Sequence, residues 1–181
     1  MPRLFFGLEI PPDTRDALLR VQQTQAALAG ARWHRDSQLH LTLAFLGEVP
    51  EGAVATAVEA GRQVRAEPFS VQVQGLGCFG DPERPGILWA GVAPEAPLAA
   101  LHRRLADALA QQGLVLEDRP YRPHITLSRF RRSAGPVTGL LSQYAGTEFG
   151  ALPVSGMALF LSSPGSVYSV LERFPFAGED A

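Results

Sequence analysis

The sequence contains the same short pattern twice, and both copies begin with a histidine. HLTLAFLG occupies positions 40–47 and HITLSRF occupies positions 124–130, and the chain has only four histidines. The copies are 84 residues apart, since 124 minus 40 is 84. The repeat predicts two related lobes whose motif strands face each other. At the same offset further identical residues align without gaps: Leu4 with Leu88, Gly7 with Gly91, Arg20 with Arg104, Ala26 with Ala110, and Arg35 with Arg119.

The spacing of apolar residues predicts strands and helices in a similar order in both halves. Period-two alternation and short apolar runs indicate strands, whereas apolar residues three and four apart indicate helices. Strands are expected over 4–10, 39–46, 69–74, 87–92, 154–161 and 168–174, and at the second motif. Helices are expected over 13–30, 51–66, 97–112 and 137–144, with Asp13 as the N-cap of the first. The fold class is therefore α+β.

Composition narrows the class of protein. With 181 residues, 46% of them hydrophobic, the chain has enough apolar surface for one folding unit. A net charge of −2 argues against a protein that coats nucleic acid through bulk positive charge. The single cysteine, Cys78, excludes an intramolecular disulfide and fits a reducing cytoplasm. Since the sequence shows neither a signal-peptide cleavage pattern nor an apolar run of about 18 residues, we expect a cytoplasmic protein that does not bind membranes.

The repeated pattern places a histidine and a threonine on one face of each motif strand. Residues i and i+2 of a strand point the same way, so His40 shares a face with Thr42, and His124 with Thr126. The leucines and isoleucine between them face the other side, where they can pack into a core. If the two strands approach each other, two imidazoles and two hydroxyls line a cleft between the lobes.

This set of side chains suits a phosphodiester. In-line displacement at phosphorus requires a base on one side and an acid on the other. Histidine, with an unperturbed pKa of about 6.5, can serve as either near neutral pH. The threonine hydroxyls would bind the non-bridging oxygens, so the scheme requires no metal and no cofactor.

Each candidate also has a structural interpretation. A lone histidine in a strand is more often a packed or surface residue, and two copies in equivalent settings are what favour catalysis. Zinc binding by His40 and His124 is a second alternative, but no cysteine or carboxylate lies at the short spacing expected of further ligands. Arg129 points away from the histidine face under strict alternation, and it reaches a phosphate only if the strand bulges or ends there.

Other residues near the motifs carry weaker indications. A basic region flanks the second motif, and it forms either an anion-binding edge of the cleft or a solvated surface. It comprises Arg119, Arg122, Arg131 and Arg132. Trp33 and Tyr168 are candidates to stack on a base, with ordinary packing as the alternative. His34, His102 and Cys78 have no motif around them and are assigned no role.

The sequence resembles the two-histidine phosphoesterases, and within them the RNA 2′,3′-cyclic phosphodiesterases, also called 2′-5′ RNA ligases. The paired HLTL and HITL are the signature of this family. The likeness extends to RLFFGLEIP, RWHRDSQLHLTLAFLGEV, PYRPHITLSRF and LFLSSPGSVYSVLERFPF, and so covers nearly the whole chain. The resemblance implies a single bilobal domain over residues 1–181, with two pseudo-symmetric lobes of antiparallel sheet plus helices around a central cleft. The segment 162–168 is shorter than is usual in the family.

The resemblance also implies metal-independent hydrolysis of RNA 2′,3′-cyclic phosphate ends, or of cyclic nucleotides, to 2′-phosphomonoesters. His40 is then the general acid that protonates the departing 3′ oxygen, and His124 is the general base that activates water. Thr42 and Thr126 hold the phosphate, and Arg129 matches the family's arginine after the second motif. The expected partner is RNA, and the expected state is a monomer. The alternatives are ATP-independent 2′-5′ ligation of RNA in the same cleft, or a non-catalytic nucleotide-binding protein.

Overall fold

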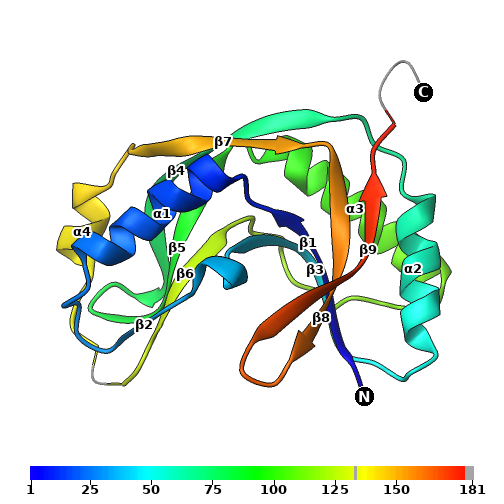
Figure 1. Ribbon diagram of the computed structural model, residues 1–181, viewed down its shortest axis with the longest axis horizontal. Helices are drawn as coiled ribbons and strands as arrows, with labels where there is room; N and C mark the ends of the chain where they lie inside the picture. Colours follow the sequence, from blue (N-terminus) through cyan, green and yellow to red (C-terminus); the bar gives the residue numbers. More distant parts are fainter. Residues whose placement is uncertain (133, 178–181) are drawn as a thin grey trace.

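The strands that carry the repeated motif lie at the centre of one antiparallel sheet (Figure 1). The computed structural model describes residues 1–132 and 134–177, and within them the sheet has nine strands. The strands are β1 (Arg3–Glu9), β2 (Ala31–Trp33), β3 (His40–Glu48), β4 (Phe69–Asp81), β5 (Arg84–Ala93), β6 (Ile125–Phe130), β7 (Glu148–Val154), β8 (Gly156–Ser163) and β9 (Val167–Pro175). The helices are α1 (Pro12–Thr24), α2 (Ala53–Gln63), α3 (Ala96–Gln111) and α4 (Thr138–Gln143), with a short 3-10 helix η1 (Asp36–Gln38). The strand order is β7-β4-β5-β6-β3-β1-β8-β9, and β2 pairs with β6 beyond the point where β3 leaves it.

The sheet divides into two lobes that meet at one pair of residues. In the described ladder, β3 and β6 pair at Leu41 and Ile125. These residues are 84 positions apart, the same offset as the motif histidines, so a pseudo-two-fold axis passes between them. β3, β1, β8 and β9 form the first lobe, and β6, β5, β4 and β7 form the second. The expected α+β class with two pseudo-symmetric lobes of antiparallel sheet is confirmed.

The same offset relates other elements of the two lobes. A shift of 84 residues brings β1 onto β5, α1 onto α3, β3 onto β6, α2 onto α4 and β4 onto β8, within a few residues at each end. Of the outermost strands, β7 has no counterpart at this offset, and β9 lies 84 residues after β5, which already corresponds to β1. β2 also breaks the symmetry, because its counterpart at 115–117 forms no strand. The two lobes therefore share the order of most of their strands and helices, and they differ at the outermost strands and at β2.

Each lobe is covered by a helix that follows a strand of the other lobe. α1 follows β1 in the first lobe but packs on β7 in the second, and α3 follows β5 in the second lobe but packs on β3 and α2 in the first (Figure 1). Thr14 of α1 donates a hydrogen bond of 2.7 Å from Oγ1 to the carbonyl of Ala151. A Cβ at Gly150, where φ is +140°, would lie 2.4 Å from that Oγ1, so this close approach requires glycine. The exchanged helices tie the lobes together.

The main core lies between these helices and one face of the sheet. On the motif strands it takes Leu41, Leu43, Ile125 and Leu127, each at most 3% exposed. The opposite face carries the histidines and threonines of the motifs, and we call it the inner face. The helices contribute Leu18, Val21, Leu98, Leu101, Leu105 and Leu109 to the same core.

Several expected element bounds are wrong, among them the strand expected over 69–74, which extends to Asp81 as β4. Asp13 lies inside the first turn of α1 and not at its N-cap, because Pro12, which has no N–H to leave unpaired, takes the first helical position after Pro11. α1 also ends at Thr24, short of the expected position 30. The strand expected over 154–161 is the end of β7 and most of β8, with Ser155 between them.

Candidate active site

The first motif strand contains a β-bulge just after its threonine. In β3, neighbouring residues of β1 pair with Thr42 and with Ala44, so Leu43 is the extra residue. A bulge changes the face of the side chains beyond it. Accordingly Leu43 and Ala44 are both buried, and Phe45 is 53% exposed. His40, Thr42 and Phe45 therefore share the inner face.

The second motif strand has the same bulge at the corresponding position. Neighbouring residues of β5 pair with Thr126 and with Ser128, so Leu127 is the extra residue of β6. Ser128 is fully buried and Arg129 is exposed. The bulge turns Arg129 to the inner face beside His124. A bulge at this point is the condition, stated from the sequence, under which this arginine can face a phosphate.

His40 is anchored by the segment that leads into its strand. Its Nδ1 lies 2.7 Å from the carbonyl oxygen of Gln38, and its Nε2 lies 3.0 Å from Thr42 Oγ1. A carbonyl oxygen can only accept, so Nδ1 carries a hydrogen and donates it. In the neutral ring Nε2 then holds the lone pair and accepts from the Thr42 hydroxyl. Proton transfer by His40 is therefore confined to Nε2.

His124 is anchored in the same way. Its Nδ1 lies 2.6 Å from the carbonyl oxygen of Arg122 and donates to it. Gln38 and Arg122 are 84 positions apart, so the pseudo-two-fold axis relates the two anchoring carbonyls. Each imidazole is thus held through Nδ1 and presents Nε2, and the register at the axis places His124 next to Thr42 and His40 next to Thr126.

Aromatic rings pack around His40. Its ring lies 4.7 Å from the ring of Phe5 and meets the ring of Tyr168 edge-on at 5.2 Å, measured between centroids. Phe160 stacks on Phe5 at 4.9 Å. Tyr168, a candidate for base stacking in the sequence, is thus part of the wall that holds this imidazole.

Aromatic rings also pack around His124, but they come from other positions than those around His40. Its ring meets Phe79 edge-on at 4.8 Å and lies 6.2 Å from Trp89. The guanidinium of Arg122 lies over the Phe79 ring, with Cζ 5.1 Å from the centroid. Trp89 corresponds to Phe5 at the offset of 84, so each histidine packs against an aromatic residue from the strand next to its own.

Both histidines have a lowered pKa in the free protein. Burial is the main cause for His40, opposed by its hydrogen bond to the Gln38 carbonyl and reinforced by the charges of His124 and Arg129. Burial also lowers the pKa of His124, again opposed by its backbone hydrogen bond, and the charges of Arg122 and Arg129 lower it further. The surroundings of both imidazoles therefore favour their neutral form in the free protein, and a bound anion would shift each pKa upward.

Arg129 acts on both histidines from the second lobe. Its positive charge contributes to the lowered pKa of His40 and of His124, so it lies within electrostatic reach of both. The structure thus gathers the five residues predicted from the sequence, His40, Thr42, His124, Thr126 and Arg129, at the axis on one face of the sheet.

The other residues considered in the sequence, His34 among them although it was assigned no role, fall in different places. Trp33 packs against the main core and not on the inner face. Arg119 pairs with Glu117 in the loop before the second motif. His34 is buried, and burial followed by the charge of Arg129 and other nearby groups lowers its pKa to about 4. These positions leave Trp33 and His34 with packing roles.

His102 and Tyr121 support the first motif strand, a role that the sequence did not reveal. The two rings stack at 4.2 Å with an angle of 3° between their planes. His102 Nδ1 donates to the carbonyl of Leu43 at 2.6 Å, and the Tyr121 hydroxyl donates to the carbonyl of Thr42 at 2.8 Å. In the second lobe the matching carbonyl of Leu127 accepts from a backbone N–H, that of His34. In the first lobe, side chains therefore donate the hydrogen bonds to the motif strand. In the second lobe, β2 and the residue after it bond the motif strand through their backbone.

No group of three or more histidine, cysteine, aspartate or glutamate side chains that could hold a metal ion occurs among residues 1–132 and 134–177. The motif histidines are surrounded by hydroxyls, aromatic rings and arginines instead. The arrangement can therefore supply an acid, a base and hydrogen-bond donors to an anion from its own side chains.

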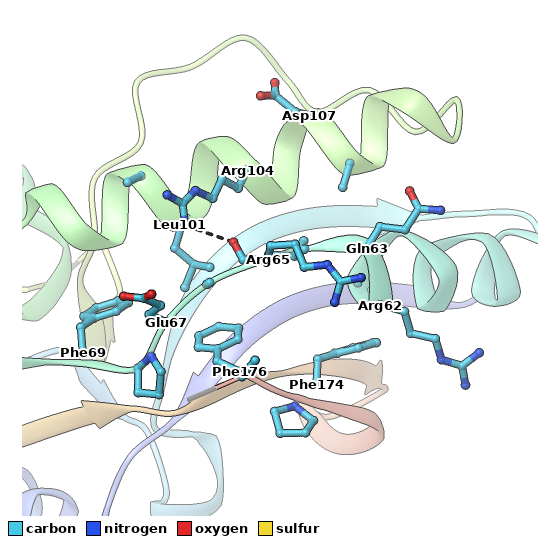
Figure 2. A pocket seen from close by; sticks show the side chains of 18 of the residues that line it. Arg62, Gln63, Arg65, Glu67, Phe69, Leu101, Arg104, Asp107, Phe174 and Phe176 are labelled. Carbon is cyan, nitrogen blue, oxygen red and sulfur yellow. Dashed lines mark hydrogen bonds between the residues drawn. The ribbon is translucent and has the colours of Figure 1, made fainter. Parts of the chain in front are cut away.

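A groove of about 1430 Å³ lies away from the motifs, and none of the motif residues lines it. Figure 2 shows it between α2, α3 and the end of β9, with Leu101, Phe174 and Phe176 facing it and Arg62 at its rim. The guanidinium of Arg104 donates to the carbonyl of Arg65 across one side. Because its lining mixes apolar, basic and acidic groups without a convergent polar set, it is not the candidate active site.

Comparisons with known proteins identify the family of the chain. The RNA 2′,3′-cyclic phosphodiesterase of Thermus thermophilus is 34% identical over 187 residues, which cover 98% of this chain and 91% of that protein. The protein of the same name from Archaeoglobus fulgidus is 28% identical over 175 residues, covering 95% and 99%. The crystal structure of Escherichia coli LigT in the apo form matches with a TM-score of 0.79 and 28% identity, over 97% of this chain and 98% of that chain. The sequence model of the 2′-5′ RNA ligase superfamily matches residues 11–160. The chain belongs to the 2′-5′ RNA ligase superfamily.

Proposed function

We propose that this protein hydrolyses 2′,3′-cyclic phosphate ends of RNA, and 2′,3′-cyclic nucleotides, to 2′-phosphomonoesters without a metal, by means of His40 and His124. The relatives named RNA 2′,3′-cyclic phosphodiesterase support the reaction class. The observation that carries the mechanism is the identical anchoring of both imidazoles through Nδ1, which leaves both Nε2 atoms for proton transfer.

In the proposed reaction the two histidines act on opposite sides of the phosphorus. Nε2 of His124 takes a proton from water, and the water oxygen forms a bond to phosphorus. The bond from phosphorus to the 3′ oxygen breaks, and Nε2–H of His40 protonates that oxygen. The products are a free 3′ hydroxyl and a 2′-phosphate, and solvent restores the proton of His40 and removes that of His124. The order of the two roles follows from the resemblance to the family.

Three further residues would hold the phosphate in this reaction. The hydroxyls of Thr42 and Thr126 flank the axis, and the guanidinium of Arg129 is exposed on the same face. Donors of this kind stabilise the charge that develops on the non-bridging oxygens. Escherichia coli LigT, a structural neighbour, has been crystallised in complexes with phosphate and with 3′-AMP, which supports a phosphate and a nucleotide as ligands of this face.

Phe45 is the exposed aromatic ring on the inner face. It occupies in the first lobe the position that Arg129 has in the second, since 129 minus 45 is 84. The guanidinium carbon of Arg3 lies 5.4 Å from its centroid. A base of the substrate can stack on such a ring, which neither Trp33 nor Tyr168 presents as freely.

The test is hydrolysis of 2′,3′-cyclic AMP by the purified protein in excess EDTA, with separation of the 2′- and 3′-phosphate isomers. We expect turnover to the 2′-isomer in the presence of the chelator. Binding without turnover would identify a nucleotide-binding protein. Turnover that returns only with added zinc or manganese, or a 3′-phosphate product, would refute the metal-free two-histidine scheme.

The superfamily to which the chain belongs is named for 2′-5′ RNA ligation, which is a second candidate activity. A 5′ hydroxyl in place of water would form a 2′-5′ bond at the same phosphorus by the microscopic reverse of cleavage. Water at high concentration favours hydrolysis. Incubation of cyclic-phosphate RNA with a 5′-hydroxyl RNA, followed by gel analysis, compares the two rates directly.

We further propose that residues 1–181 act as one functional domain, in the cytoplasm and as a monomer. The helices exchanged between the lobes support one unit. Among the helices that the structure describes, none combines the length and the apolar character that a bilayer span requires. Size-exclusion chromatography with light scattering would measure the oligomeric state, and a dimer would overturn that part of the proposal.

A further inference from the structure

β2 brings a second arginine beside Arg129. In the β2–β6 ladder Arg32 lies directly opposite Arg129. Residues directly opposite each other in an antiparallel pair have side chains on the same face, with Cβ atoms about 5 Å apart. The next pair along this ladder is Trp33 with Ser128, and both of those side chains belong to the core side of the sheet. Arg32 and Arg129 therefore project together from the inner face.

This pair of like charges is unfavourable in the absence of a ligand. Arg32 and Arg129 are both exposed, and neither takes part in an ion pair with any of the residues that the structure describes. Like charges directly opposite each other across two strands destabilise a sheet. Two adjacent guanidinium groups are, however, a strong donor set for phosphate, because each offers a planar fork of N–H groups. The arrangement is favourable once an anion lies between or beside them.

Arg32 is displaced from the histidines along β6. β3 pairs with β6 at Ile125, and β2 takes over the same edge of β6 at residues 128–130. Arg32 lies opposite Arg129, four residues along β6 from Ile125, and on the side of Arg129 away from β5. Arg32 therefore does not face the phosphate that would lie between the imidazoles. Arg129 lies between Arg32 and that phosphate position.

The arginine pair belongs to the second lobe alone. At the offset of 84, Arg129 corresponds to Phe45, and the first lobe has no strand at 115–117 to correspond to β2. The inner face thus has an aromatic ring on one side of the axis and two guanidinium groups on the other. A polynucleotide, which has both bases and successive phosphates, matches this asymmetry better than a mononucleotide does.

We propose that Arg32 binds the phosphodiester on the 5′ side of the terminal nucleotide of an RNA substrate, while Arg129 holds the cyclic phosphate. This inference rests on the proposed function and names the part of the substrate that lies beyond the reacting group. RNA with at least two nucleotides is then the preferred substrate, and a cyclic mononucleotide lacks one of the two anions that the arginine pair binds.

The experiment compares kcat/KM of the whole protein on 2′,3′-cyclic AMP with that on an adenosine dinucleotide that ends in a 2′,3′-cyclic phosphate. Arg32→Gln is the test variant and Arg32→Lys the conservative one. Arg103→Gln is the matched control, because Arg103 is an exposed arginine of α3 and its loss removes the same charge from an outer helix.

We expect the dinucleotide to be the better substrate of the wild-type protein. Arg32→Gln should lower kcat/KM on the dinucleotide about tenfold more than on the mononucleotide, as expected for one charged hydrogen bond. Arg32→Lys should restore part of this difference, and Arg103→Gln should leave the ratio of the two substrates unchanged. The slope of log(kcat/KM) against log[salt] on the dinucleotide should become shallower by about 0.7 in Arg32→Gln.

The outcomes separate this inference from the proposed function. If the wild-type protein turns over neither substrate, the proposed function fails. If it turns over both but the ratio is the same in wild type and Arg32→Gln, the phosphodiester subsite is wrong and the proposed function stands. An equal loss on both substrates together with a lower melting temperature would make Arg32 a structural residue, which also refutes the subsite.

Discussion

Replacing Tyr121 with phenylalanine removes one hydroxyl and should loosen the first motif strand. That hydroxyl donates to the carbonyl of Thr42 at 2.8 Å, at the start of the bulge, and burial raises its pKa. His102 bonds the next carbonyl, that of Leu43, and stacks on Tyr121. Without the hydroxyl the Thr42 carbonyl loses its described side-chain donor.

The expected size of the effect follows from the burial of this bond. Leaving a buried acceptor unpaired costs about 1 to 3 kcal/mol, and the half-buried site of Tyr121 favours the lower part of that range. For a domain of this size each kcal/mol lowers Tm by about 2 to 4 °C. Thr42 also bonds Nε2 of His40, so the same displacement should lower kcat about three- to tenfold while KM changes less.

The assay is a thermal melt together with steady-state hydrolysis of 2′,3′-cyclic AMP by the wild type, Tyr121→Phe and Tyr144→Phe. Tyr144 is a half-buried tyrosine that packs on Phe149 in the second lobe, so its variant controls for loss of a hydroxyl elsewhere. A Tyr121→Phe protein with the Tm and kcat of the wild type would show that the bulge carbonyls need no side-chain donor. A fall in Tm with unchanged kcat would limit Tyr121 to stability.

Three further predictions concern the histidines and the contact between the lobes. His40→Ala and His124→Ala should each lower kcat by about 10² to 10⁴ with little change in Tm, and normal turnover in both would make the histidines structural. The pKa of His34 lies near 4 in the fold and near 6.5 in the unfolded chain, so its neutral form stabilises the fold above pH 6.5. That stability should fall by about 2 to 3 kcal/mol between pH 6.5 and 4, and denaturant titrations of His34→Leu should show a shallower decline. Gly150→Ala should cost about 2 kcal/mol, because its Cβ would collide with Thr14 Oγ1, and an unchanged denaturant midpoint would contradict the close approach.

The repeat was sufficient to predict the two related lobes and the meeting of their motif strands. The offset between His40 and His124 fixed which strands correspond, and the strand pair at the axis, Leu41 with Ile125, has the same offset. The period-two pattern correctly separated the core side of each motif strand from the side that carries His40 and Thr42. Both features depend on local sequence alone, which is why they can be predicted without the structure.

The parts of the site that depend on pairing between distant segments could not be predicted. A bulge arises from the register with the neighbouring strand, so the face of Arg129 was undetermined until β5 and β6 were seen together. The support of Thr42 by Tyr121 joins residues 79 positions apart, and that of Leu43 by His102 joins residues 59 apart. No periodic pattern marks such contacts, because each donor lies on a different element from its acceptor.

The departures from symmetry bear on how two identical motifs can take opposite roles. Both imidazoles are anchored alike, and both have a pKa lowered first by burial. Two arginines act on His124, Arg122 and Arg129, whereas of the two only Arg129 is among the charges that act on His40. The charge of His124 in turn lowers the pKa of His40, so each ring has a positive neighbour that the other lacks. This difference predicts that Arg122→Gln raises the pKa of His124 and leaves that of His40 nearly unchanged, so that one limb of the pH–rate profile shifts and the other does not. A profile of kcat that keeps the wild-type limbs in Arg122→Gln would show that the asymmetry has another source.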